Sequence, residues 1–147
     1  MDYLIDEIDR QIVGCLAEDA RMSLKVLSAR VGLTSPSTAE RVKRLEERGV
    51  IQGYGAHVNL AALGYTLQAQ VRVRPMPGML HRVDKMIQAI PECIECDKVT
   101  GEDCFVMRLV VRSIAQLDEL LDGLAEYAQS NTAIVKSSPV VRRLPPI

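Results

Sequence analysis

The sequence of 147 residues has no tryptophan, one phenylalanine, two histidines and a net charge of only −1. His57 and His81 stand far apart with no serine or cysteine nucleophile motif beside either, so a catalytic triad is not expected. A phosphate-binding glycine loop, a G-x-G-x-x-G motif and an assignable pair of catalytic carboxylates are also missing. These absences exclude the commonest enzyme signatures, and we expect no catalytic residue and no cofactor.

Long apolar runs are also missing from the sequence. No run reaches the roughly 18 residues that a membrane span needs. The first ten residues, MDYLIDEIDR, are acidic, whereas a signal peptide begins with a basic and then an apolar stretch. We therefore expect a cytoplasmic protein with no membrane partner.

Four cysteines are present, and Cys93 and Cys96 form a C-x-x-C motif. A zinc site needs a second pair of ligands, and a redox motif needs a helix that starts after a strand; the sequence has neither. Positions three apart in a strand face opposite sides, so these two thiols are predicted to diverge. The interpretation favoured here is that the cysteines are small buried apolar residues and that there is no metal site.

The small net charge hides an uneven distribution along the chain. Residues 1–20 hold six acids and one base, residues 21–48 hold seven bases and three acids, and the remainder is balanced. A basic segment is the electrostatic footprint of a phosphate-binding surface, although a solvated surface is an equally common explanation. The total charge therefore does not exclude a nucleic-acid partner.

Three short helices are predicted before residue 50. Apolar residues spaced three or four apart predict the first helix from Asp6 to about residue 18. Ser23 is a suitable N-cap for the second helix, and Gly32 suits the left-handed position that ends it. Thr34 or Ser35 caps the third helix, Pro36 falls in its first turn, and Gly49 stops it. This arrangement is typical of a helix-turn-helix.

The third helix carries the candidate DNA-binding residues. Small polar side chains at its start could hydrogen-bond base edges in the major groove, and the arginines one turn later could reach guanine or phosphate. Its polar residues, Thr38 and Arg41 among them, are expected to point outward. The alternative is a packing module with solubilising charges. The predicted DNA-binding residues are Ser35, Ser37, Thr38, Arg41, Lys43 and Arg44.

The rest of the chain predicts a ferredoxin-like β-α-β-β-α-β domain. Residues 65–74 alternate apolar and polar side chains, as in a half-buried strand. A helix from Leu80, strands over 93–99 and 105–112, a helix opened by a Ser113–Gln116 capping box and a last strand over about 133–143 follow. Val50 and Ile51 predict a short strand. The predicted organisation is α+β: a helix-turn-helix domain over 1–52, a linker over 53–64 and a ferredoxin-like domain over 65–147.

The turn after Val99 is a candidate ligand site. Gly101 lets backbone N–H groups approach a ligand carboxylate, and Glu102 and Asp103 could hold an ammonium group. A plain hairpin turn would explain the same residues.

Several blocks of sequence occur in an order that is specific to one family. They are Ile5-Asp6-x-x-Asp9-x-x-Ile12, Asp19-Ala-Arg21-x-Ser23, Val31-Gly-Leu33-Thr-Ser35, Arg41-Val-Lys-Arg-Leu45-Glu-Glu-Arg-Gly49-Val-Ile51 and Val99-Thr-Gly101. The chain thereby resembles the Lrp/AsnC family of transcription regulators over nearly its whole length.

The resemblance implies a winged type of helix-turn-helix and a ligand-sensing domain of the ferredoxin-like type. It further implies dimers that pack sheet against sheet and assemble into octamers, with amino-acid effectors bound near the Gly101 turn between dimers. Family members commonly have an aspartate where this chain has Cys104, and a threonine-rich stretch where it has Lys136, Ser137 and Ser138. The effector-binding residues predicted in this way are Gly101, Glu102, Asp103, Cys104, Ser137 and Ser138.

We therefore expect a regulator that binds double-stranded DNA in a sequence-specific way, is not an enzyme, and responds to a small amino acid through its DNA binding or its assembly. Two alternatives remain from the sequence. One is an architectural DNA-binding protein, and the other is a metabolic enzyme that binds amino acids on its ferredoxin-like domain.

Overall fold

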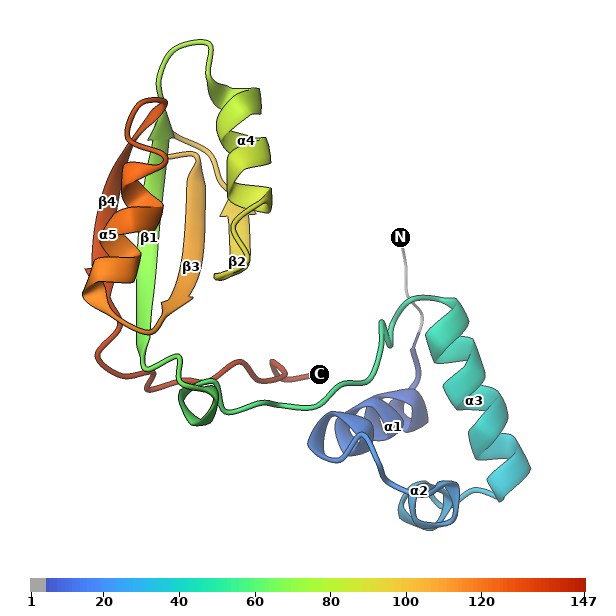
Figure 1. The fold of residues 1–147 in the computed structure, drawn as a ribbon. Coiled ribbons are helices and arrows are strands. Elements are labelled where there is room, and N and C mark those ends of the chain that lie inside the picture. The colour runs from blue at the N-terminus through green and yellow to red at the C-terminus, as the bar shows by residue number, and fades with distance from the viewer. Residues whose placement is uncertain (1–4) are drawn as a thin grey trace. The chain divides into compact units, whose positions relative to one another are not determined.

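The computed structural model describes residues 5–147 and divides into two compact units. The first unit comprises the chain up to residue 57 together with residues 140–147, and the second comprises residues 58–139 (Figure 1). Residues 140–147 are predicted from sequence to lie in the C-terminal domain, whereas the structure groups them with the first unit. Residues 1–4 of the predicted first domain lie outside the described part. In residues 5–147, no helix has the length and apolar character to cross a membrane.

Three helices form most of the first unit. They are α1 (Glu7–Glu18), α2 (Leu24–Val31) and α3 (Ser35–Glu47). Each begins where a side-chain oxygen accepts a backbone N–H: Asp6 caps α1, Ser23 caps α2 and Thr34 caps α3. Gly32 ends α2 in the left-handed conformation, with φ of 70°. The predicted helices and caps are confirmed.

The core of the first unit consists of one apolar residue from α1, two from α2 and one from α3. These are Ile12, Leu27, Val31 and Leu45, and none is more than 8% exposed. Burying such a side chain contributes about 1.5–3 kcal/mol. This cluster therefore fixes α3 against the other two helices.

The strand predicted at Val50 and Ile51 is not formed. The N–H groups of both residues donate to the carbonyl oxygen of Leu45, at 2.9 and 3.1 Å, and so they close the end of α3. They cannot also serve a strand ladder. Among the described residues of the first unit there is no strand, so the expected wing is absent.

The second unit has the predicted β-α-β-β-α-β order, preceded by a single 3-10 turn. Its elements are η1 (Ala61–Leu63), β1 (Leu67–Pro75), α4 (Leu80–Gln88), β2 (Cys93–Lys98), β3 (Phe105–Val111), α5 (Ile114–Asp122) and β4 (Ala128–Ile134). The strands form one antiparallel sheet in the order β2-β3-β1-β4. The ferredoxin-like prediction is confirmed.

Both helices pack against the same face of this sheet (Figure 1). Strand β1 shows the resulting alternation: Ala69, Val71 and Val73 are fully buried, whereas Gln70, Arg72 and Arg74 are exposed. The helix-covered face holds the core of the unit, and on the other face β1 carries polar side chains.

Two local predictions in this unit are wrong. The last strand is β4 at Ala128–Ile134 and not 133–143. Its side chains after Ala128 are all exposed, so the strand has no alternation of buried and exposed residues. It is a strand because its backbone pairs with β1. The side chain of Gln116 accepts from the N–H of Arg112 at 2.7 Å, so Ser113 caps α5 without the reciprocal bond of a capping box.

The C-x-x-C motif also differs from the prediction, because β2 contains a bulge between Cys93 and Glu95. Cys93 is paired with Leu109 and Cys96 with Met107, and these two partners are two residues apart on β3. The bulge therefore places both cysteines on the same face of the sheet. Cys93 is half-buried and Cys96 is exposed, so the prediction of buried cysteines is wrong for Cys96.

Candidate functional site

The outward surface of α3 presents three of the predicted DNA-binding residues. Ser37, Lys43 and Arg44 are exposed. Lys43 has a loose ion pair with Glu47 one turn later, at 3.7 Å, and both side chains are well exposed. Arg44 makes no side-chain hydrogen bond or ion pair within residues 5–147, so its guanidinium is available to a phosphate or a base edge.

Thr38 points inward, and the prediction that it points outward is wrong. The residue is 0% exposed, and its Oγ1 donates to the carbonyl oxygen of Thr34 at 2.9 Å. The inward positions of α3 recur at residues 38, 42 and 45, so the small hydroxyl residue lies on the apolar face. A buried side chain with its hydroxyl bonded to its own helix cannot reach a base.

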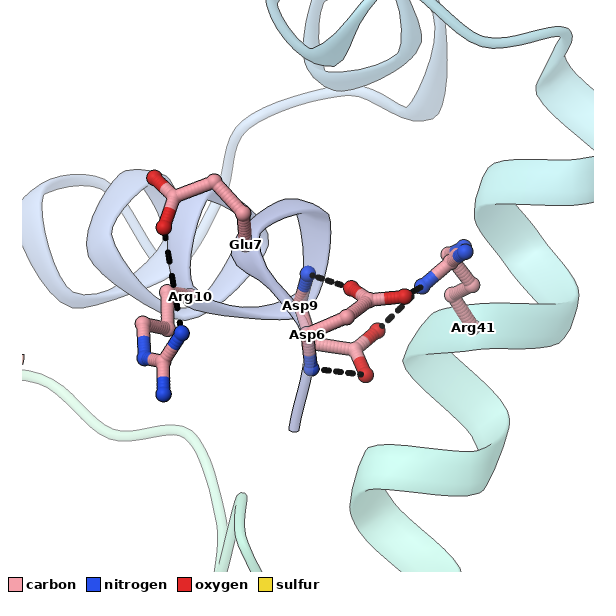
Figure 2. A network of polar contacts seen from close by, with 5 residues as sticks. All are labelled: Asp6, Glu7, Asp9, Arg10 and Arg41. Atoms are coloured by element: carbon pink, nitrogen blue, oxygen red, sulfur yellow. Dashed lines mark hydrogen bonds and ion pairs between the residues drawn. The ribbon is translucent and has the colours of Figure 1, made fainter. Parts of the chain in front are cut away.

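Arg41 also does not point outward as predicted. Its Nη1 donates to Oδ2 of Asp6 at 2.7 Å and to Oδ1 of Asp9 at 2.9 Å (Figure 2). Only 22% of the Arg41 side chain is exposed. The arginine therefore joins α3 to the N-terminus of α1, and its charge is used within the unit.

The two aspartates that receive Arg41 also cap α1. The N–H of Asp9 donates to Oδ1 of Asp6 at 2.8 Å, and the N–H of Asp6 donates to Oδ2 of Asp9 at 3.4 Å (Figure 2). The Asp9 N–H bond, followed by the bond from Arg41, holds the pKa of Asp6 below its ordinary value. The same arrangement raises the pKa of Arg41. The acidic N-terminus of α1 and the basic α3 thus partly neutralise each other.

The two serines at the start of α3 differ in access. Ser35 is half-buried, and its Oγ lies 3.4 Å from Oγ of Ser28 on α2. Ser37 is exposed, and its Oγ accepts a hydrogen bond from Oγ1 of Thr34 at 3.0 Å. Ser37 retains a hydroxyl proton that it can donate.

Glu40 is exposed on α3 between Ser37 and Arg44, and the sequence reasoning missed it. Residues three or four apart on a helix share a face, so the spacing from Ser37 and to Arg44 could have indicated that Glu40 lies on the same surface of α3. A carboxylate among basic side chains repels a phosphate group, but it can accept a hydrogen bond from the amino group of cytosine.

In the second unit, the turn at Gly101 lies between β2 and β3. Gly101 has a φ of 106°, a conformation that favours glycine. Asp103 Oδ1 accepts from Nε of Arg74 at 2.9 Å, and Glu102 Oε2 lies 3.2 Å from the Nη2 of the same arginine. Both predicted acids are therefore paired with Arg74, a residue of β1 that the sequence reasoning missed.

The predicted effector residues do not converge within one chain. Val73 pairs with Phe105, so the turn lies at the end of the sheet where β1 finishes. Ala69 pairs with Ile134, and the N–H of Val135 donates to Gln68, so the chain after β4 leaves at the other end. Ser137 and Ser138 are exposed and follow the end of β4 at Ile134, although they were predicted to lie within the last strand. The turn and the two serines thus lie at opposite ends of one sheet.

The cysteines of this unit offer little chemistry. Cys104 is half-buried and packs against the apolar core. Loss of solvent around the sulfur is the main reason that the pKa of Cys96 is raised to about 11. A thiol that stays protonated at neutral pH is a poor nucleophile. Within the described residues, no group of three metal-binding side chains occurs.

Two family models match the chain in sequence. The AsnC-type helix-turn-helix domain matches residues 5–46, and the Lrp/AsnC ligand binding domain matches residues 68–145. The chain is 37% identical to the HTH-type transcriptional regulator LrpA of Mycobacterium tuberculosis over 133 residues, which cover 90% of this chain and 89% of that protein. The chain belongs to the Lrp/AsnC family.

Solved structures of Lrp/AsnC proteins have the same fold. Bacillus subtilis LrpC superposes with a TM-score of 0.88 and 27% identity, covering 94% of this chain and 99% of that chain. The feast or famine regulatory protein of M. tuberculosis, complexed with L-methionine, superposes with a TM-score of 0.87 and 34% identity, covering 95% and 97%. The helix-turn-helix match contains every candidate DNA-binding residue, and the Lrp/AsnC ligand-binding match contains every candidate effector residue and Arg74.

Proposed function

We propose that this chain is a sequence-specific, DNA-binding transcription regulator, not an enzyme, whose DNA binding or assembly responds to a small amino acid. The observation that carries the proposal is the match of both Lrp/AsnC domain models in their family order along one chain. The exposed polar surface of α3 and the turn at Gly101 supply the two sites that such a regulator needs. We also propose that it acts in the cytoplasm.

The DNA-binding surface is the outward side of α3. In a helix-turn-helix, the second helix of the motif enters the major groove of double-stranded DNA. We expect the exposed Ser37 and Arg44 to contact bases or phosphates there, and the exposed Lys43 to contact phosphate. Thr38 and Arg41 have no direct part in this contact, because both are used inside the unit.

The effector is a small amino acid bound at the Gly101 turn. A related M. tuberculosis protein has been solved in complex with L-methionine, and the ligand-binding domain model covers this turn. Ser137 and Ser138 contribute only if a second copy brings its own chain to the turn, because within one chain they lie at the other end of the sheet.

This geometry favours an effector site completed between copies, and hence a homo-oligomer. Dimers form through the polar face of the sheet that α4 and α5 leave uncovered, and dimers assemble further into octamers. A two-fold dimer presents two copies of α3 and favours a pseudo-palindromic DNA site. Binding of the amino acid shifts assembly, which changes how many copies of α3 meet the DNA.

Two measurements on the full chain test this function. Fluorescence anisotropy with DNA from the region upstream of its own gene should give at least about 10³-fold tighter binding than random DNA at equal salt. Equal affinity would indicate an architectural protein instead. Thermal unfolding with each of the twenty amino acids, with size-exclusion chromatography alongside, should reveal one that raises the melting temperature and shifts assembly. Turnover of an amino acid would indicate an enzyme.

A further inference from the structure

Arg74 is in contact with both acidic side chains of the Gly101 turn. The register explains its position: Val73 pairs with Phe105, the first residue of β3, so Arg74 lies beside the residues that immediately precede that strand. Its side chain is on the polar face of the sheet, and it reaches Asp103 with Nε and Glu102 with Nη2.

The backbone of the turn can bind an anion. Within residues 5–147, the N–H groups of Gly101, Glu102 and Asp103 make no hydrogen bond. Successive unused N–H groups in a turn form a concave surface that attracts a carboxylate or a phosphate. Two carboxylate side chains on the same turn would by themselves repel such an anion.

We propose that Arg74 determines the ligand class of this turn, by neutralising Glu102 and Asp103 so that the backbone N–H groups bind the α-carboxylate of the effector. The inference rests on the proposed function, in which the turn is the effector site. It assigns the two acids a role different from holding the ammonium group, since both are already paired with the guanidinium. The carboxylate is then the group of the amino acid that the turn selects.

Both the charge of Arg74 and its contacts with the turn favour binding of the ligand carboxylate. Loss of Arg74 leaves two uncompensated negative charges beside the ligand carboxylate, and it also releases the turn from β1. For a ligand that has an ammonium but no carboxylate, the freed acids are attractive instead. The sign of the effect therefore depends on the charge of the ligand, which a purely structural role of Arg74 does not predict.

The test is calorimetric titration of the full chain with L-methionine and with L-methioninamide, which keeps the ammonium but replaces the carboxylate with a neutral amide. If another amino acid binds better in the panel of twenty, that amino acid and its amide replace this pair. Wild type should prefer the acid over the amide. Arg74→Gln should weaken binding of the acid about fivefold, the scale of an exposed ion-pair network, with binding of the amide unchanged or tighter.

Two variants make the result specific. Arg72→Gln removes the same charge from the same strand and the same face, but Arg72 makes no ion pair with either acid within residues 5–147. It should keep the preference of wild type. Arg74→Lys keeps the positive charge but loses the guanidinium fork that reaches both acids, so it should bind the acid more tightly than Arg74→Gln does.

Three outcomes would overturn the inference. If Arg74→Gln binds the acid as wild type does, or binds the acid and the amide more weakly by the same factor, Arg74 does not set the ligand class. The proposed effector site is not contradicted by that result. If Arg74→Lys is as impaired as Arg74→Gln, geometry and not charge is responsible. If wild type binds none of the twenty amino acids, the proposed effector site fails and this inference fails with it.

Discussion

Nη1 of Arg41 lies 2.9 Å from Oδ1 of Asp9, which joins the third helix of the first unit to its first helix. The two residues are 32 positions apart in the sequence. The side chain of Asp9 is only 14% exposed, so the pair is better shielded from solvent than the other ion pairs of this unit within the described residues. An arginine on a helix expected to bind DNA thus has a structural role.

Replacing Arg41 should therefore destabilise the protein. Arg41→Ala leaves Asp9 without its cation, and we expect a loss of about 1 kcal/mol in the free energy of unfolding, the upper range for a solvent-screened ion pair. Urea denaturation of the full chain measures it. Arg44→Ala, three residues along the same helix, is the control and should unfold like wild type. Equal stability of the two variants would contradict the role given to Arg41.

Arg44 and Lys43 should affect DNA binding in different ways. Arg44→Ala should weaken binding to the specific site by about 1–3 kcal/mol if the guanidinium reaches a base, with binding to random DNA much less affected. Lys43→Ala should weaken both kinds of DNA alike and reduce the salt dependence by about one phosphate contact. Anisotropy titrations over a range of salt separate these effects. A uniform loss for Arg44→Ala would make it a phosphate contact.

The first unit should lose stability in acid in part through Asp6. The folded protein holds the pKa of Asp6 below its ordinary value of 3.8, chiefly through the Asp9 N–H bond and then through Arg41. The stabilisation is therefore fully present above pH 3.8 and is lost as the pH falls through the lower folded value. Unfolding of Asp6→Asn should be less dependent on pH below 4 than that of wild type. Parallel curves for the two proteins would show that Asp6 does not contribute.

Tyr54 should titrate later than an ordinary tyrosine. Its Oη donates to Oε1 of Glu46 on α3 at 2.7 Å, and burial followed by this bond raises the pKa of Tyr54 to about 12. Because the folded pKa is raised, the stabilisation is present below pH 10 and is lost as the pH rises through about 12. Absorbance at 295 nm should show a step near pH 12 that Tyr54→Phe removes and Tyr65→Phe leaves. Survival of that step in Tyr54→Phe would rule out Tyr54 as its source.

The helices of the first unit could be predicted because their signals are local. Ser23, Thr34 and Gly32 cap or end helices through bonds that span only a few residues. The orientation of Arg41 could not be predicted in this way, since its partners Asp6 and Asp9 lie in another helix. Helical periodicity alone leaves Arg41 at the border between the apolar and the polar face of α3.

The second unit shows the same division between local and distant causes. Strand β1 could be predicted because its alternation records which face is buried. Strand β4 could not, because the polar run Gln129, Ser130, Asn131, Thr132 has no such alternation and is a strand only through its pairing with β1. Arg74 was missed for a related reason, since the register between β1 and β3 brings it to the turn.

The path of the chain has a practical consequence for dissecting the protein. The second unit is an insertion within the first, with covalent junctions at residues 57–58 and 139–140. A single proteolytic cut at residues 57–58 therefore leaves the second unit joined to residues 140–147 of the first unit, and a cut at residues 139–140 leaves it joined to the helices of the first unit. Releasing the second unit from both parts of the first takes two cuts. A fragment ending at residue 57 would lack Leu144, which lines a hollow of the first unit together with Val13 and Leu16 of α1. A first unit produced on its own keeps this contribution of Leu144 only if residues 140–147 are joined to residue 57 by a linker.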